Sequence, residues 1–204
     1  TLKIYLEAIN AAYSNKDIDQ MEQLASVAIE KTKTLLDQVK IYEAKINAFI
    51  SYDDKSAVLN TAFDILEKLG VKISRKNYAL HILPYLIKTK IRLRNFKYED
   101  LLNLPKIKDE NIIASMRILS LISPTAYVSA PNLLLLIACK FIELTLKFGI
   151  SVDSCYGFVG YSLILAALGD IDGSYHYRSI ALDFTNIAKT KKTEGQTITL
   201  AEVF

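Results

Sequence analysis

The chain has 204 residues, of which 51% are hydrophobic and 23% are charged, and its formal net charge is +3. This length is enough for one ordinary domain or a short helical array, and the apolar content excludes an intrinsically disordered chain. Seven glycines and four prolines are too few for an all-β fold with its many turns. The small net charge argues against non-specific nucleic-acid binding, which needs a larger and more clustered basic excess.

Two cysteines, Cys139 and Cys155, form neither a disulfide framework nor a zinc-binding pattern. We expect both to be buried as small hydrophobic side chains in a reducing, cytoplasmic environment. Residues 1–13 carry charge and lack the apolar core of a signal peptide. The sequence begins with Thr1 rather than Met and ends with the apolar residues Val203 and Phe204. We therefore expect residues 1–204 to be one helical-repeat domain that is a fragment of a longer chain.

Apolar residues recur at three- and four-residue spacings along most of the chain, which predicts amphipathic helices. No segment alternates convincingly enough to predict a strand. In chain order we expect helices over residues 3–14, 18–36, 38–50, 57–69, 77–95, 109–123, 131–148, 153–168 and 172–189, with another helix beginning in 193–204.

Residue types at the expected helix ends indicate how the helices begin and end. Asp54 or Ser56 is a candidate N-cap for the helix over 57–69, and Asp109 for the helix over 109–123. Gly70 and Gly149 follow expected helix ends, where a left-handed glycine is common.

No charged residue lies between Arg117 and Lys140, and the run is long enough to raise the possibility of a membrane span. A spanning helix needs about 20 predominantly apolar residues. Pro124 and Pro131 flank the polar sequence TAYVSA in the middle of the run. We therefore predict a break between two buried helices, and no membrane span.

Segments 15–30 and 169–184 can be superimposed so that both place D-I-D at a turn. Segment 52–67 follows the first turn by about one tetratricopeptide period of roughly 34 residues. We predict an all-α fold in which antiparallel helix pairs stack as a right-handed tetratricopeptide-like α-solenoid, although residues 71–130 do not keep the period. At the later turn, Gly169 is expected to adopt a positive φ, and Asp170 or Asp172 to cap the next helix.

The search for catalytic chemistry finds no phosphate-binding loop, nucleophile elbow or metal-binding motif. The glycines of GFVGYS (157–162) are interpreted as close helix packing. His81 and His176 lack partners at metal-ligand spacing, and a Cys155–His176 nucleophile pair would require a spatial contact that sequence cannot show. Carboxylates such as Asp53 are interpreted as turn or cap residues. We therefore expect no catalytic, cofactor-binding or metal-binding residue.

Residues 72–106 hold nine lysines and arginines against two acids, Glu99 and Asp100. Lys88 and Arg92 fall on one helical stripe at 100° per residue, and Lys90 and Arg94 fall on another. A solvated surface is the default interpretation of such a charge run, and the alternative is a docking face for an acidic partner or RNA. The interleaved aromatic residues are Tyr78, Tyr85, Phe96 and Tyr98.

Four segments together resemble a known family: LLDQVKIYEAKINAFI (35–50), ILEKLGVKI (65–73), residues 98–137 and residues 146–184. The order L-N-L-P, A-S-M-R-I-L, P-N-L and L-G-D-I-D carries the resemblance. It is similar to the helical region of large bacterial signalling proteins, abundant in cyanobacteria. In those proteins a Ser/Thr kinase-like domain and an AAA-type predicted ATPase precede a tetratricopeptide-like region. A GAF domain and a sensor histidine kinase often follow it.

The resemblance implies a non-catalytic interaction and regulatory module whose partners are neighbouring domains of the same chain. The catalytic residues of that family lie in other domains, so the resemblance assigns no functional residue here. Two alternatives remain: a helical module that binds RNA, a membrane surface or an acidic partner through residues 72–106, and an all-α enzyme of unfamiliar type. The partner-binding residues and the oligomeric state are not predicted.

Overall fold

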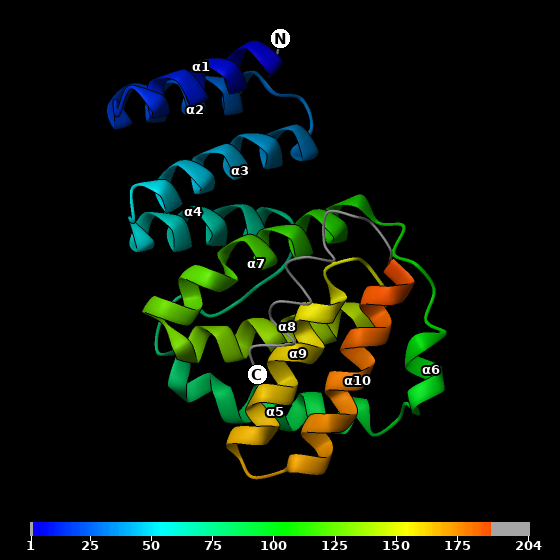
Figure 1. Cartoon of the computed structure of the whole chain (residues 1–204). Helices are drawn as coiled ribbons and strands as arrows, with labels where there is room; N and C mark the ends of the chain where they lie inside the picture. The colour runs from blue at the N-terminus through cyan, green and yellow to red at the C-terminus, as the bar shows by residue number, and fades with distance from the viewer. Residues whose placement is uncertain (1, 189–204) are drawn as a thin grey trace.

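The computed structural model describes residues 2–188, and these residues form ten α-helices and no strand (Figure 1). The all-α prediction is therefore confirmed. The helix predicted to begin in 193–204 lies outside the described residues. The helices are α1 (Leu2–Ser14), α2 (Ile18–Lys31), α3 (Leu35–Ser51), α4 (Lys55–Lys68), α5 (Tyr78–Leu93), α6 (Tyr98–Leu102), α7 (Glu110–Ser129), α8 (Pro131–Phe148), α9 (Ser154–Ala167) and α10 (Ile171–Ala188).

The turns α1–α2, α3–α4 and α9–α10 share one construction. Each first helix is followed by a residue with positive φ, and the next residue is an aspartate that accepts a hydrogen bond of 2.9 Å from a backbone N–H three residues on. The aspartate N–H in turn donates to a carbonyl five residues back. The residue pairs are Lys16–Asp17, Asp53–Asp54 and Gly169–Asp170, with φ values of 60°, 58° and 82° at the first member.

The turn at Gly169 therefore closes a helix end and caps the next helix. Its positive φ is confirmed, and Asp170 rather than Asp172 is the cap. Asp54 and Asp109 are likewise the caps of α4 and α7, since each accepts backbone N–H bonds in the first turn. A cap supplies an acceptor for N–H groups that have no partner within the helix.

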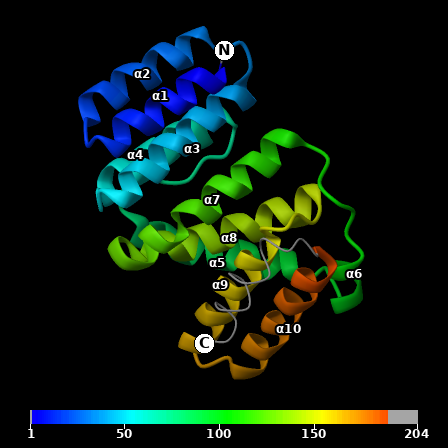
Figure 2. The ribbon, with the colours of Figure 1, turned by 45° about the horizontal axis from the view of Figure 1, so that its top comes forward.

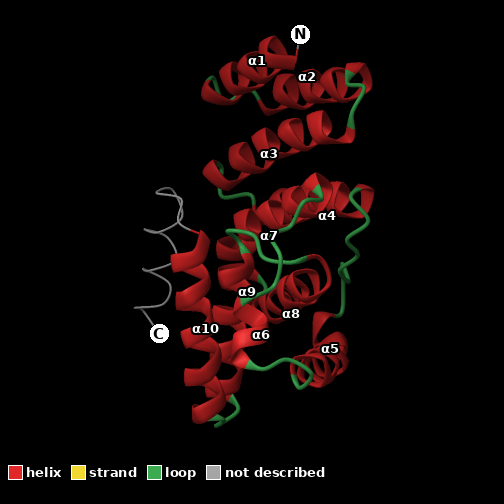
Figure 3. Cartoon of the chain, turned by 90° about the vertical axis from the view of Figure 1, so that its right-hand side faces the viewer, coloured by secondary structure: helices red, strands yellow, loops and turns green. Residues whose placement is uncertain are grey.

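Most helices contact their neighbours in chain order (Figures 2 and 3). The pairs α1–α2, α3–α4, α7–α8 and α9–α10 each pack together, and α2 contacts α3, α4 contacts α7, and α8 contacts α9. The helices α5 and α6 do not follow this order: α5 packs on α8, and α6 packs on α10. α7 packs directly on α3 and α4, so the segment between α4 and α7 lies outside this succession of contacts.

The apolar side chains form two buried clusters that meet at α8. Leu133, Ile137 and Phe141 face the cluster shared with α1–α4 and α7. Ala138 and Ile142 face the cluster shared with α5, α6, α9 and α10. Because α8 is covered on both sides, it can be apolar almost all round, as the sequence LLLLIAC shows.

Two predicted helix boundaries are wrong. The break placed near residue 37 lies at residues 32–34, because the Thr34 hydroxyl accepts the N–H of Asp37 and begins α3 earlier. The helix predicted over 109–123 continues through Pro124 to Ser129. A proline inside a helix costs about 3 kcal/mol. Burial of Ile122 and Ala126 on either side of it favours continuation.

By length and composition, α7 is the one described helix that could cross a membrane. Ile118, Leu119 and Ile122 of α7 are fully buried, and the helix packs against α3, α4 and α8. The uncharged run is thus divided between α7 and α8, which turn back on each other at Ala130 (Figure 1). This arrangement is that of core helices in a folded domain.

Candidate functional site

The histidines and cysteines considered as reactive groups lie in different settings. His81 is half-buried on α5, whereas His176 is exposed on α10 with its ring 4.9 Å from that of Tyr177. Cys139 and Cys155 are both buried, and burial raises the pKa of the Cys139 thiol. Within residues 2–188, no group of three or more His, Cys, Asp or Glu side chains is placed to hold a metal ion.

The glycines of GFVGYS mark close contact between α8 and α9. A Cβ atom at Gly157 would lie 2.5 Å from the Cβ of Phe141, and one at Gly160 would lie 2.7 Å from the Cβ of Ala138. Real Cβ atoms do not approach this closely, so both positions require glycine as long as the helices stay in place. The interpretation as helix packing is confirmed.

The basic segment 72–106 is divided by the fold. Arg75 pairs with Asp64 and Glu67 of α4 at 2.8 Å each, outside α5. The aromatic residues of the segment are half-buried and are not available as exposed stacking surfaces: Tyr78, Tyr85, Phe96 and Tyr98. Tyr98 donates a short hydrogen bond to Asp183, which holds α6 on α10 and raises the pKa of Tyr98 to about 12.

The contact between α5 and α8 contains one carboxylate shared by three cations. Glu143 of α8 lies 2.6 Å from Lys140, 3.0 Å from Arg92 and 3.4 Å from Lys88. Partial burial disfavours the charged form of Glu143, but the three cations outweigh it and lower its pKa to about 2. Lys140 also lies over the ring of Tyr85, 5.5 Å from its centroid. This cluster fixes the side of α5 that carries Lys88 and Arg92.

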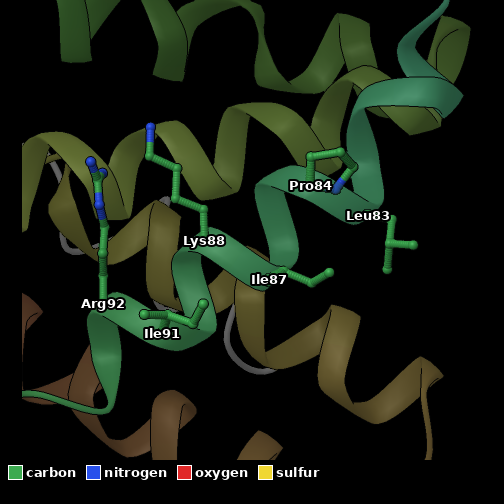
Figure 4. A pocket seen from close by; sticks show the side chains of 6 residues that line it. All are labelled: Leu83, Pro84, Ile87, Lys88, Ile91 and Arg92. Atoms are coloured by element: carbon green, nitrogen blue, oxygen red, sulfur yellow. The ribbon is translucent and has the colours of Figure 1, made fainter.

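The side of α5 that faces away from the buried Thr89 and Leu93 carries an exposed apolar stripe that sequence reasoning missed. Its members are 75%, 66%, 51% and 58% exposed, in the order Leu80, Leu83, Ile87 and Ile91. Together with Pro84, Lys88 and Arg92, the last three line a shallow depression (Figure 4). All its lining residues come from α5 itself, so it is an open helix face and not an enclosed cavity.

A signal for this face was present in the sequence. At 100° per residue, Leu80, Ile87 and Ile91 fall between the two basic stripes already noted, and Leu83 falls between Lys90 and Arg94. The buried side of α5 is apolar as well, with Leu86 and Leu93 in the buried cluster where α5 packs on α8. Because α5 has apolar residues on two sides, its periodicity alone does not tell which side is covered. We call Leu80, Leu83, Ile87 and Ile91 the α5 stripe.

Comparison of the chain with protein-family models, with curated proteins and with solved structures gives no match in any of the three. The resemblance to bacterial signalling proteins therefore remains a prediction. The candidate functional surface rests on the geometry of α5 and its surroundings.

Proposed function

We propose that this chain is a non-catalytic protein-interaction and regulatory module, in which antiparallel helix pairs stack as a right-handed tetratricopeptide-like α-solenoid. The observation that carries the proposal is the repeated turn of a left-handed residue followed by a capping aspartate, found in three helix pairs. Repeat proteins bury their apolar faces only against neighbouring units, and the contacts between successive helix pairs follow that order.

The placement of reactive groups supports a binding role. The cysteines are buried and the two histidines lie on different helices, while four of the fourteen exposed large hydrophobic side chains of the described residues lie on α5. Exposed contiguous apolar patches on folded proteins mark interaction sites. In the proposal, the partner is a neighbouring domain of a multidomain signalling protein with kinase and ATPase domains, and the module acts in the cytoplasm.

The test begins with the reading frame on both sides of the chain. Any flanking domain is expressed separately, its binding to the 204-residue chain is measured by calorimetry, and its phosphoryl-transfer or ATPase rate is measured with and without the chain. Saturable binding that changes the rate is the expected result. Absence of both binding and a rate change for every flanking domain would overturn the regulatory proposal.

Of the alternatives, docking of an acidic partner through residues 72–106 has support in the cationic residues of α5. Arg75, Lys88 and Arg92 already pair with carboxylates of the chain, which reduces the positive charge open to RNA and to an acidic partner alike. Filter binding with single-stranded and duplex RNA tests the RNA-binding alternative directly, and binding that does not weaken with salt would contradict phosphate contacts.

A further inference from the structure

The α5 stripe is the inner part of a face with cationic margins. Lys88 and Arg92 lie along one margin and Lys90 lies along the other by helical position. Arg94, the C-cap residue of α5, lies in line with the stripe just beyond the end of the helix. Figure 4 shows Lys88 and Arg92 pointing to one side of α5, away from Leu83. The helix contains no aspartate or glutamate. The cationic margins therefore favour a binding partner that carries negative charge where it meets them.

The two margins differ in how far they are neutralised inside the chain. Glu143 lies against Lys88 and Arg92, so one carboxylate faces two cations of α5. Within the described residues, no ion pair involves Lys90 or Arg94, although ten pairs are formed elsewhere. A partner with carboxylates on both edges would meet uncompensated positive charge on both.

We propose that α5 docks an amphipathic helix of a partner protein, with an apolar stripe and acidic residues on its two margins. The inference rests on the proposed interaction function and names the surface and the chemistry of the partner. From Leu80 to Ile91 the stripe rises about 16 Å at 1.5 Å per residue, which matches about three turns of a partner helix. Apolar anchors at such spacings are how a helix is recognised in a groove or on a helix face.

A second copy of this chain fits the face less well. Two α5 helices packed stripe to stripe would bring Lys90 and Arg94 of one copy against basic margins of the other. Like charges placed together across an interface disfavour association. An anionic lipid surface shares the charge preference, but the stripe is confined to one helix and contains no tryptophan or tyrosine, the residues typical of membrane interfaces.

The probe is a phage-displayed library of 18-residue helical peptides. Each peptide carries a fixed stripe of leucines along one face, and the positions flanking that stripe are randomised among Asp, Glu, Lys, Arg, Ser and Ala. The library is selected on the full 204-residue chain, and the dissociation constants of enriched peptides are then measured. We expect enriched margins to be acidic. Leu83→Asp and Ile87→Asp are expected to weaken binding at least about tenfold. Ile4→Asp on α1 is the matched control and should leave binding unchanged, because Ile4 is 63% exposed, close to the 66% of Leu83, and lies on another helix.

A charge exchange tests the margins independently. Lys90→Glu with Arg94→Glu removes no ion pair of the described residues, so the fold should be retained. It should weaken acidic peptides at least about tenfold and improve matched peptides with lysine margins. Circular dichroism and thermal unfolding of each variant check that the loss of binding is not a loss of folding.

Four outcomes would overturn the inference. The first is enrichment of peptides without acidic margins, or no enrichment at all. The second is peptide binding that Ile87→Asp leaves unchanged, which would show that the peptide does not bind to α5. In that case, an effect of the chain on the activity of a flanking domain would still support the proposed function. The third is a concentration-dependent dimer abolished by Ile87→Asp. The fourth is Ile87-dependent binding to vesicles of phosphatidylcholine and phosphatidylserine without peptide binding.

Discussion

The carboxylate of Glu143 in α8 lies 3.0 Å from the guanidinium of Arg92 in α5, and Lys88 and Lys140 surround the same carboxylate. Glu143 therefore links α5, which lies outside the succession of helix pairs, to α8, which lies between the two buried clusters. Its pKa of about 2 in the folded chain lies below its ordinary value of 4.5. A lowered pKa means that the ionised carboxylate stabilises the folded state.

The first prediction concerns the pH dependence of this contact. The stabilisation by Glu143 is fully present above about pH 4.5 and is lost as the pH falls toward about 2. Glu143→Gln should therefore be less stable than the wild type at pH 7, and the difference should narrow between these two pH values. Urea unfolding across a pH series measures it. A difference that does not change with pH would contradict the assigned role. Glu30→Gln is the control, because Glu30 is exposed and forms no ion pair within the described residues.

The second prediction concerns the capping aspartate of α10. Asp170→Ala removes the acceptor for the N–H of Gly173, 2.9 Å away, and should lower the free energy of unfolding by about 1 kcal/mol. Asp170→Asn keeps a side-chain oxygen at the same place and should lie within a few tenths of a kcal/mol of the wild type. Equal losses for both variants in urea unfolding would show that the carboxylate acts otherwise than as a cap.

The third prediction separates backbone strain from steric contact at two glycines. Gly149 has φ of 110°, and a Cβ there would lie 2.0 Å from the carbonyl oxygen of Pro105. Gly70 has φ of 80° with nothing within 4 Å of an added Cβ. Gly70→Ala should cost about 1 kcal/mol from backbone conformation alone.

Gly149→Ala should cost clearly more than Gly70→Ala, because the methyl group also disrupts the hydrogen bond from Ile150 N–H to Pro105. Thermal unfolding of both variants measures the difference. Similar costs at the two sites would mean that the loop after α6 moves away freely, and that its contact with the α8–α9 junction is weak.

The fourth prediction concerns the close approach of α8 and α9. Alanine is favoured over glycine within a helix by about 1 kcal/mol, so Gly160→Ala would stabilise an isolated α9. In the folded chain the added Cβ would lie 2.7 Å from that of Ala138, so we expect a net loss of about 1–3 kcal/mol. Adding Ala138→Gly makes room for the new methyl group. A double-mutant cycle should therefore give a favourable coupling of at least about 1 kcal/mol, whereas strict additivity would exclude the contact.

Helix existence and capping could be predicted because they depend on residues close together in the sequence. The stripe of Met21, Ala25 and Ala28 and the cap at Asp54 are local patterns, and the structure confirms both. The boundary at Pro124 could not be predicted in this way. Whether a proline ends a helix depends on what the residues on either side of it bury, and Ile122 and Ala126 are buried by packing with other helices.

The all-α class, the helix-pair turns and the role of Gly169 can be predicted from the sequence, since each follows from backbone sterics and hydrogen bonding within a few residues. Which side of α5 is exposed depends on packing between helices that are distant in the sequence. Leu86 and Leu93 on one side and Leu83 and Ile87 on another are equally apolar in the sequence. The choice between them is made by α8, about 50 residues later, where Glu143 attracts Lys88 and Arg92 and so orients the helix. Whether a helix face is buried depends on both the helix and the element that packs against it, and the apolar pattern of a helix describes only the helix itself.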